Sequence, residues 1–265
     1  MHNSIISIIT VTYNASELLE KTILSVLEQS YNNVEYIIID GGSKDATVEC
    51  IRKYKDQLAY WESKPDRGIY HAMNKGVAKA TGAWICFLNA GDVFDNKFVV
   101  EKMVAAIPTD KSAKILYGDV ITLGKDGERN EKIASAPCNK HRMYFCHQSA
   151  FVSTNLLRTY PFDENYKMSA DFKFFKESYY RGDGFVHMPF PVAIYDMSGI
   201  SNTNRTAGIR ENMDVIKEVD RGIVKYKFLL KLFFTLTVLQ IRSRKKTANE
   251  DKGCRPESKI TINNL

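Results

Sequence analysis

Three short polar segments in the first hundred residues each follow an apolar stretch, and their side chains could hold an anionic ligand. The segments are Thr12, Tyr13 and Asn14; Asp40, Gly41, Gly42 and Ser43; and Asn89, Ala90, Gly91 and Asp92. The carboxyl ends of parallel strands lie along one edge of a sheet, and ligands of open α/β sheets bind in the crevice there. If the apolar stretches are parallel strands, the three segments converge on one site.

Asp92 follows an apolar run, Trp84–Leu88, which predicts a strand buried on both faces. A carboxylate here could anchor a cation, or it could simply cap a helix beginning near Asn96. The sequence has neither G-x-G-x-x-G after the first strand nor G-x-x-x-x-G-K-[ST]. A diphosphate bound without such a loop needs positive charge from elsewhere. We therefore expect Asp92 to bind Mg²⁺ or Mn²⁺, because both ions favour carboxylate and phosphate oxygens.

The segment after the second strand could contact a nucleoside. Asp40 offers two acceptor oxygens to the N–H of a base or to ribose hydroxyls. Gly41 and Gly42 would allow a ligand to lie against the backbone. By itself "DGGS" is also an ordinary turn, so the expected convergence with the other two segments is what favours binding.

The elements that must position these segments alternate between strand-like and helix-like patterns. Strands are predicted at 5–11, 34–40, 59–63 and 84–88, and helices at 16–29, 44–55 and 69–80. This alternation predicts a mostly parallel sheet between two helical layers, a Rossmann-like three-layer α/β sandwich. After residue 106 the pattern is mixed. Strands predicted at 114–121, 147–152 and 184–195, with a helix near 170–180, would extend the same sheet.

Composition limits the class of protein. The chain has 265 residues, of which 44% are hydrophobic, enough for one large domain with an appendage. Its five cysteines are odd in number and lack C-x-x-C spacing, which argues against a disulfide framework or a zinc site. The net charge of +6 lies in the last part, since residues 205–265 carry 14 Lys and Arg against 7 Asp and Glu. Without a basic globular face or a reading motif, we expect no nucleic-acid partner.

The segments "SIITVTYN", "VEYIIIDGGSKDAT" and "DRGIYHAMNKGVAKATGAWICFLNAGD" resemble the amino-terminal half of family 2 glycosyltransferases, inverting enzymes with a GT-A fold. The resemblance spans roughly residues 4–95, with several separated motifs in the expected order. It implies a nucleotide-diphosphate sugar as donor, Mn or Mg as cofactor, and transfer of the sugar to a hydroxyl. We expect a UDP- or GDP-type donor and, as in polysaccharide biosynthesis, a growing, lipid-linked glycan as acceptor, because such an acceptor would explain the basic C-terminal helix. In that family the acid closing the second strand, here Asp40, contacts the base, and the D-x-D-like signature, here residues 89–92, binds ribose and metal.

The chain departs from the family pattern in this signature. Asn89 and Gly91 stand where further acids are usual, so Asp92 is the remaining carboxylate. Metal binding would then depend on Asp92, the donor diphosphate and water.

A second departure lies in the helix "GIYHAMNKG", where His71 replaces the usual acid and receives no role. We expect Arg67 and Asn74, before and within this helix, to contact the donor. An Arg here could pair with phosphate or stack on the base, and the alternative is a solvated turn residue.

Inversion requires a general base that takes a proton from the acceptor hydroxyl. In the resembled family this acid follows the metal signature and opens a helix, a position that Asp171 in "KMSADFKFFKE" occupies. The alternative is an ordinary first-turn acid that favours the helix dipole. Asp119, at the end of a predicted strand, and His147 and Gln148 could contact the acceptor or the diphosphate, although His147 could equally be a buried structural residue.

We expect residues 1–204 to form one catalytic domain, with a nucleotide-sugar-binding half at 1–106 and an acceptor-binding half at 107–204. The polar stretch 198–205 could be a loop that closes over the donor or a plain loop. Residues 205–246 predict a basic amphipathic helical region, and 247–265 a disordered tail.

The apolar run 228–239 is shorter than the about 20 residues that span a bilayer. We expect its helix to lie in a membrane interface among anionic head groups, or else to pack on the catalytic domain. No basic leader precedes the first strand, so we predict no signal peptide and expect the protein in the cytoplasm or on the inner face of the cell membrane.

Two other functions fit parts of the pattern. A catalytically silent saccharide-binding or scaffold protein would agree with the depleted acidic signature. A sugar-phosphate nucleotidyltransferase would share the sheet but should carry a glycine-rich, basic loop after the first strand, where this chain has "TVTYNAS".

Overall fold

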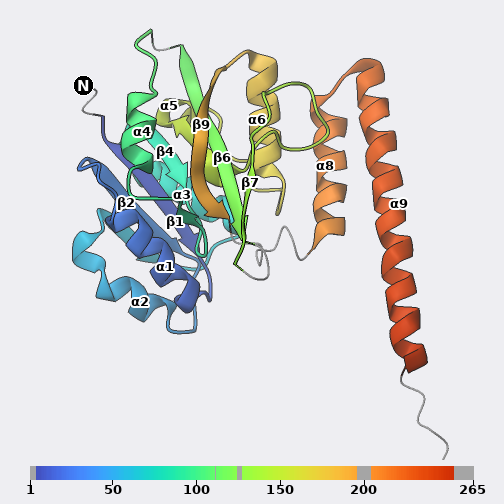
Figure 1. Cartoon of the computed structure of the whole chain (residues 1–265), viewed down its shortest axis with the longest axis horizontal. Coiled ribbons are helices and arrows are strands. Elements are labelled where there is room, and N and C mark those ends of the chain that lie inside the picture. Colours follow the sequence, from blue (N-terminus) through green and yellow to red (C-terminus); the bar gives the residue numbers. More distant parts are fainter. Residues whose placement is uncertain (1–3, 111, 124–126, 196–203, 254–265) are drawn as a thin grey trace, which may run out of the picture.

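The computed structural model describes the backbone of residues 4–253 except 111, 124–126 and 196–203, with side chains described as far as residue 241 (Figure 1). One twisted sheet has the strand order β3-β2-β1-β4-β8-β6-β9-β5, and β7 pairs with β6 outside this path. The strands are β1 (Ile6–Thr12), β2 (Val34–Asp40), β3 (Tyr60–Ser63), β4 (Trp84–Phe87), β5 (Val93–Phe94), β6 (Ala113–Leu123), β7 (Arg129–Lys132), β8 (Ala150–Ser153) and β9 (Gly184–Tyr195).

The first four strands form a parallel half-sheet. β1 pairs in parallel with β2 and with β4, and β2 pairs in parallel with β3. The second half is mixed, because β8 runs antiparallel to both β4 and β6, whereas β6 and β9 are parallel. The predicted parallel series is therefore confirmed for the first half, and the second half extends the same sheet.

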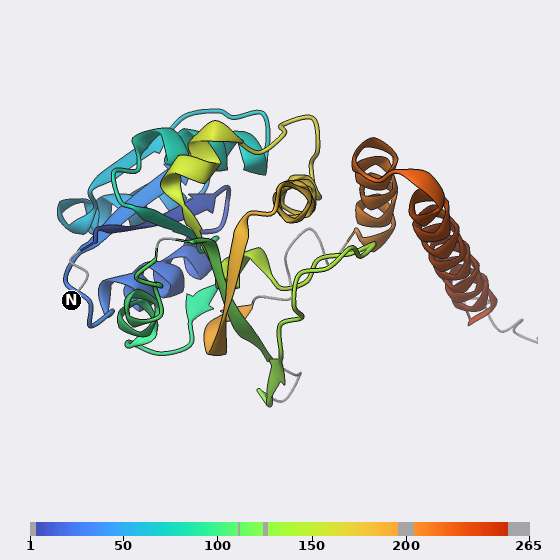
Figure 2. The same ribbon diagram turned by 90° about the horizontal axis from the view of Figure 1, so that it is seen from above.

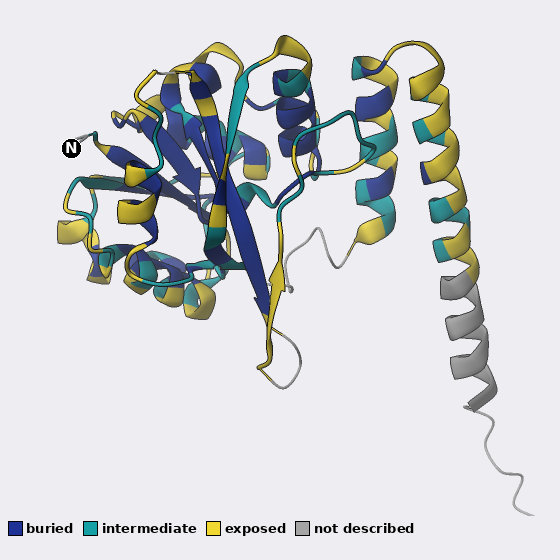
Figure 3. Cartoon of the chain, turned by 45° about the horizontal axis from the view of Figure 1, so that its top comes forward, coloured by how far each residue is buried: buried dark blue, intermediate teal, exposed yellow. Residues whose placement is uncertain are grey.

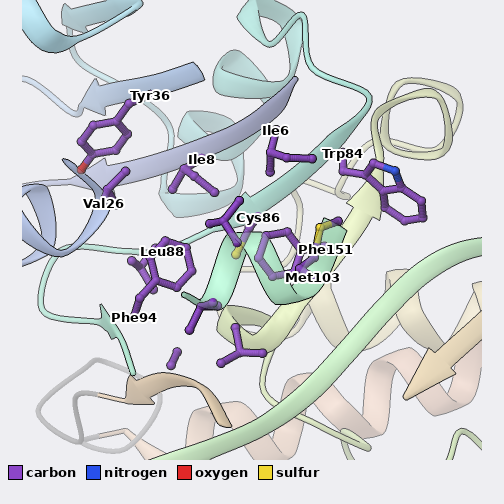
Figure 4. Close-up of a cluster of buried hydrophobic side chains, with 14 of the residues drawn as sticks. Ile6, Ile8, Val26, Tyr36, Trp84, Cys86, Leu88, Phe94, Met103 and Phe151 are labelled. Carbon is purple, nitrogen blue, oxygen red and sulfur yellow. The ribbon is translucent and has the colours of Figure 1, made fainter. Parts of the chain in front are cut away.

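Helices cover both faces of the sheet. They are α1 (Ser16–Leu27), α2 (Thr47–Lys53), α3 (Ile69–Lys79), α4 (Val99–Ala105), α5 (Thr154–Thr159), α6 (Ala170–Arg181), α8 (Arg205–Val219) and α9 (Gly222–Gly253). Buried side chains of α1, α2 and α4 pack on one face, and those of α3, α5 and α6 on the other. Figure 4 shows part of the first of these cores, with Val26 of α1 and Met103 of α4. β1 alternates between the two cores: Ile6 and Ile8 face the first, Ile9 and Val11 the second.

The structure corrects several predicted boundaries. Residues 147–149 form a 3₁₀ turn before β8 rather than the start of a strand. The short strands β5 and β7 were not predicted. Helix α4 begins at Val99, after Phe98, so Asp92 is not its cap and that alternative is excluded.

The helices α8 and α9 lie side by side at one end of the molecule (Figure 2). Phe172 of α6 shares a small core with Ile209, Val215 and Ile216 of α8 and Leu232 of α9. α9 continues through 247–253, where a disordered tail was expected, and 254–265 lie outside the described residues. Within the described part of the chain, no helix is both long and apolar enough to span a membrane.

Candidate active site

The three polar segments meet at one edge of the parallel half-sheet. The pairing of β1 with β2 places Thr12 opposite Asp40. Beyond the strands, the backbone N–H of Gly41 donates to the carbonyl of Thr12 at 3.0 Å, and that of Ala90 donates to the carbonyl of Val11 at 3.3 Å. The segments 12–14, 40–43 and 89–92 are thus neighbours.

Asp40 is fully buried, and both of its carboxylate oxygens accept hydrogen bonds from its own surroundings. Oδ2 accepts from the backbone N–H groups of Gly42 (3.1 Å) and Ser43 (2.9 Å) and from the hydroxyl of Ser63 (2.6 Å). Oδ1 accepts from the hydroxyl of Ser43. In this arrangement Asp40 shapes the loop 41–43 and does not present a free carboxylate to the crevice. Ser63, which the sequence analysis did not single out, completes the set of donors.

The loop after β1 is joined to the loop after β2. Asn14 adopts a left-handed conformation (φ 48°). Its backbone N–H donates to the Ser43 hydroxyl (2.8 Å), and its side-chain oxygen accepts from the N–H of Lys44 (2.9 Å). Tyr13 is 60% exposed beside this junction, whereas the buried Thr12 hydroxyl finds no partner among the described residues. The aromatic face of Tyr13 is therefore available to a ligand, and the preceding Thr12 has a buried hydroxyl that is unsatisfied within the described residues.

Asp66, which the sequence analysis also missed, lies over the loop after β2. A Cβ added to Gly41 would come within 2.6 Å of Asp66 Oδ2, so the Asp66 carboxylate lies close against this glycine. Oδ1 of Asp66 accepts from the N–H of Gly68 at 2.9 Å. The signal was available, since Asp66 follows β3 as Asp40 ends β2.

The turn of residues 89–92 is held from beneath by Thr22 of α1. The Thr22 hydroxyl donates to the carbonyl of Asp92 (2.8 Å) and accepts from the N–H of Gly91 (3.0 Å). Gly91 has φ 104°, a conformation that favours glycine. The N–H of Asp92 closes the turn on the carbonyl of Asn89 at 2.9 Å. Asp92 is 4% exposed, at the same edge as Asp40.

Asp171 is bound to residues from two other parts of the chain and to its own neighbour. It is 9% exposed, in the first turn of α6. Oδ1 accepts from the Tyr70 hydroxyl (2.9 Å) and from the N–H of Phe172 (2.8 Å), and Oδ2 lies 3.0 Å from Nδ1 of His147. The other ring nitrogen of His147 lies 3.2 Å from the amide nitrogen of Asn89. Two contacts therefore connect Asp171 with the turn that carries Asp92.

These contacts set the ionisation of the group. Burial favours a raised pKa for Asp171, but the hydrogen bonds from His147 and Tyr70 and the charge of His147 outweigh it, so the pKa lies below its usual value. Burial favours a lowered pKa for His147, but the carboxylate of Asp171, aided by Asp92, raises it. Burial and then the charge of Asp171 raise the pKa of Tyr70. At neutral pH Asp171 is thus a carboxylate and Tyr70 a neutral donor.

Helix α8 fixes the backbone before Asp171. Both carboxylate oxygens of Glu211 accept from the N–H of Lys167 (2.9 and 3.1 Å), and one also accepts from the N–H of Met168 (2.7 Å). Glu211 falls in the region predicted to be an appended helical segment, where no site residue was expected.

Two predicted donor-binding residues bind other parts of the protein. The side-chain amide of Asn74 accepts from the N–H of Phe162 (3.0 Å) and donates to the carbonyl of Phe162 (2.9 Å) and to Glu164 (3.1 Å). The guanidinium of Arg67 pairs with Glu164, although the side chain is 68% exposed. Both side chains hold the segment after α5. The geometry gives Asn74 a structural role, because its donor and acceptor are both engaged.

Asp119 and Gln148 lie near the site without opening onto it. Asp119 does not end a strand, because β6 continues to Leu123. It is 5% exposed and accepts from the N–H of Ala134 (2.7 Å), and His187 lies 3.1 Å away. Gln148 is buried in the 3₁₀ turn beside His147. Of the stretch 198–205, predicted to be a loop that closes over the donor or a plain loop, residues 198–203 lie outside the described residues.

The turn of Asp92 offers oxygen ligands for a cation. The side-chain oxygen of Asn89 on the same turn is buried and has no hydrogen-bond partner within the described part of the chain. A carboxylate and an amide oxygen suit Mg²⁺ or Mn²⁺. No group of three or more His, Cys, Asp or Glu side chains that could hold a metal occurs among the described residues. The turn therefore fits a metal whose remaining ligands come from a substrate and water.

Comparisons with known proteins agree with this architecture. An uncharacterized glycosyltransferase of Mycobacterium tuberculosis is 39% identical over 114 residues, which are 43% of this chain and 44% of that protein. A PGL/p-HBAD biosynthesis glycosyltransferase of Mycobacterium bovis is 31% identical over 176 residues, 63% of this chain and 67% of that protein. The chain thus spans less than half of the first relative's length and about two thirds of the second.

Solved structures of similar fold include TarS of S. aureus in complex with UDP-GlcNAc (TM-score 0.64, 17% identity, 86% of this chain and 71% of that chain). Another is the mannosyltransferase PcManGT of Pyrobaculum calidifontis in complex with GDP-Man and Mn²⁺ (TM-score 0.65, 16% identity, 89% and 70%). They support the predicted GT-A fold. The model of glycosyl transferase family 2 matches residues 7–164. The chain belongs to glycosyl transferase family 2.

Proposed function

We propose that the protein transfers a sugar from a nucleotide-diphosphate sugar to a hydroxyl of a saccharide, with inversion and with a divalent cation. The observation that carries this proposal is the pair of contacts from Asp171 through His147 to Asn89. It joins a buried, ionised carboxylate to the turn that bears Asp92. A proton acceptor and a cation-binding turn so linked can act on the attacking hydroxyl and on the leaving diphosphate of one displacement.

The donor would lie along the edge formed by the loops after β1, β2 and β4. We assign the exposed ring of Tyr13 to the base and the unpartnered hydroxyl of Thr12 to the nucleoside. Asp40, Gly42 and Ser43 would act through the shape of their loop, because the Asp40 carboxylate is engaged there. A UDP- or GDP-type donor is supported by the ligands of TarS and PcManGT, which share the fold.

In the reaction, the acceptor hydroxyl attacks the anomeric carbon while its proton passes to Asp171 Oδ2. That oxygen has a single described partner, His147, and so retains the capacity to accept. The bond between the anomeric carbon and the diphosphate oxygen breaks, and the nucleoside diphosphate leaves with the bonding pair. Tyr70 and His147 hold the carboxylate ionised and oriented. A Mg²⁺ or Mn²⁺ on Asp92, with Asn89 beside it, would neutralise charge on the diphosphate.

The acceptor is proposed to be a growing glycan carried on a membrane lipid, at the cytoplasmic face of the membrane. The name of the M. bovis relative, which places it in PGL/p-HBAD biosynthesis, agrees with such an acceptor. The basic C-terminal region would then lie near a membrane surface, which we take as a partner. The finer identities of sugar and linkage are set by pocket shape.

The decisive experiment is a thermal-shift screen of nucleotide-diphosphate sugars with and without Mn²⁺. We expect one nucleotide class to raise the melting temperature only with metal, and Asp92→Ala to remove that shift. Asp95→Ala is the matched control, because Asp95 is a nearby acid that pairs with Arg129 outside the turn. A shift that persists in Asp92→Ala would contradict the proposed metal site.

The single carboxylate of the signature favours one alternative, a catalytically silent saccharide-binding protein. Such a protein would bind the donor or acceptor but would neither transfer sugar nor hydrolyse the donor with Mn²⁺. Turnover that depends on Asp171 excludes it. Membership of glycosyl transferase family 2 argues against a nucleotidyltransferase.

A further inference from the structure

Helix α9 exposes a continuous apolar stripe. Six of its large side chains are between 50% and 84% exposed: Ile223, Tyr226, Leu230, Phe233, Phe234 and Ile241. Their spacing of three, four and seven residues places them on one face of the helix, since residues at these intervals lie above one another. We call these six residues the apolar stripe. In Figure 3 much of the described part of α9 has the yellow of exposed residues.

The stripe is not required for the packing of α9 within the chain. The opposite face supplies Leu232, which is 5% exposed, and partly buried residues including Phe228 and Leu236. These contact α8 and Phe172 of α6 in one small core. Since one face already anchors the helix, the stripe is surplus apolar surface, and contiguous surface of this kind marks an interaction site.

Cations beside the stripe come from α9 itself, and further cations come from the loop 140–142, which packs against α9 at Phe228. The ring of His141 lies 5.7 Å from the ring of Phe228, which brings the loop 140–142 against α9. Burial and then the charges of Lys231, Arg142, Lys176 and Lys140 lower the pKa of His141, so these cations lie close together. Lys227 precedes Lys231 by one helical turn. We call Lys140, Arg142, Lys227 and Lys231 the basic cluster.

The charge pattern identifies the kind of partner. Residues 222–241 contain no Asp or Glu. A second copy docking through this face would bring two basic clusters together, which opposes self-association. An anionic lipid surface can bind both features, because its head groups pair with the cations of the basic cluster and its acyl chains contact the apolar stripe. We propose that the apolar stripe and the basic cluster together bind the surface of an anionic lipid bilayer.

This inference deepens the proposed transfer to a lipid-linked acceptor and rests on it for its purpose, but the binding is measured without sugar transfer. The docking surface is firmly joined to the catalytic helix. Lys176 of α6 and Asp220, just before α9, form an ion pair of 2.9 Å in which neither side chain is exposed. A bilayer that orients α9 therefore also orients α6, whose first turn carries Asp171.

Co-sedimentation of the full chain with vesicles tests the proposal. We expect binding to vesicles of phosphatidylcholine with one quarter phosphatidylglycerol, and at least tenfold weaker binding to phosphatidylcholine alone. The paired substitution Leu230→Glu and Phe234→Glu should weaken binding to the anionic vesicles at least tenfold. Lys231→Glu with Arg142→Glu should do the same without altering the stripe. Leu24→Glu, an exposed apolar residue of α1, is the matched control and should bind as wild type.

Several results would overturn the inference. These are wild type that stays in solution with anionic vesicles, either double variant that binds them as well as wild type, or a Leu24→Glu variant that loses as much. Self-association abolished by the stripe variants, in the absence of vesicle binding, would assign the stripe to a second copy instead. The same variants should retain the metal-dependent thermal shift with a nucleotide sugar. A chain that binds vesicles but shows no such shift would contradict the proposed function and leave this inference standing.

Discussion

Two buried carboxylates of this protein are both hydrogen-bonded through both oxygens, but their partners are organised in different ways. Asp40 is held by Gly42 and Ser43, within three residues of it, and by Ser63 of the adjacent strand. Asp171 is held by Tyr70, 101 residues away in sequence, and by His147, 24 residues away. The first acid is part of a local loop, whereas the second lies where three elements meet.

The two carboxylates therefore have different roles: Asp40 fixes the shape of a loop, and Asp171 can take part in a reaction. Every described partner of Asp40 is a donor of its own loop or of β3, so that carboxylate fixes backbone geometry. Asp171 has its pKa set by distant residues and keeps capacity on Oδ2. Changes at Asp40 should therefore reduce stability and donor binding, and changes around Asp171 should mainly reduce turnover.

The largest effect is expected for Asp171→Asn. The amide cannot take the acceptor proton, so kcat should fall by roughly 10²–10⁴, the range of general-base catalysis. The melting temperature and the metal-dependent shift with the donor should remain near wild type. Measured turnover within a factor of about three of wild type would show that Asp171 is not the general base. The contrast between a structural Asp40 and a reactive Asp171 would then fail.

Asp40→Ala should affect stability instead. It leaves the N–H groups of Gly42 and Ser43 and the hydroxyl of Ser63 without their acceptor in a buried place. Unsatisfied buried groups cost about 1–3 kcal/mol each, and partial access of water should limit the sum to about 3 kcal/mol in the free energy of unfolding. Urea denaturation measures it. Ser63→Ala, which removes a single donor, should cost about 1 kcal/mol in the free energy of unfolding. An equal loss of stability in the two variants would contradict the idea that Asp40 stabilises its loop through several separate hydrogen bonds.

His147→Ala should lower kcat by roughly 30-fold, about 2 kcal/mol, because a charge-assisted hydrogen bond to the base is lost. His147 holds the pKa of Asp171 below its usual value, so its removal raises that pKa. As the pH falls, the variant should lose activity at a higher pH than wild type does. His147→Asn, whose amide can still donate at the Nδ1 position, should recover part of kcat. If the variant loses activity at the same low pH as wild type, His147 does not influence the pKa of Asp171 and acts only through packing.

The smallest effect is expected for Glu211→Ala in α8. Its carboxylate fixes the backbone of Lys167 and Met168 just before Asp171. Loss of this support should lower kcat about five- to tenfold, about 1 kcal/mol, while the donor KM stays unchanged. Glu211→Gln, which keeps one acceptor oxygen, should lie between wild type and alanine. A change confined to the donor KM would show that α8 affects binding of the donor and not the position of Asp171.

The sequence predicts those parts of the fold that local patterns encode. Alternating apolar runs and amphipathic helices are enough to predict β1 to β4 and their parallel pairing, and hence the meeting of Thr12, Asp40 and Asp92 at one edge. The two-residue strand β5 is too short for any periodicity to register. The turn 147–149 was predicted as strand because its polar residues directly precede the apolar run of β8.

The hydrogen bonds between side chains of the site were harder to predict from the sequence, for a physical reason. Hydrophobic periodicity predicts which face of an element is buried, but it does not say which polar groups meet across elements. Tyr70, Thr22 and Glu211 act through contacts with residues far away in sequence. Asn74 was predicted to bind the donor, yet its amide forms two hydrogen bonds with the backbone of Phe162. The donor roles of the strand-end residues stay predictions until ligand binding is measured.

The enclosed pair of Lys176 and Asp220 limits how this protein can be recombined with its relatives. The Lys176 ammonium also donates to the side chain of Asn139 and to the carbonyl of Lys140, both at 2.8 Å, so its surroundings are built for a charge. A chimaera that takes its last two helices from another family member without an acid at position 220 would leave a bare ammonium in the interior. Breaking such a pair costs about 3–5 kcal/mol. Grafts should therefore exchange both partners together.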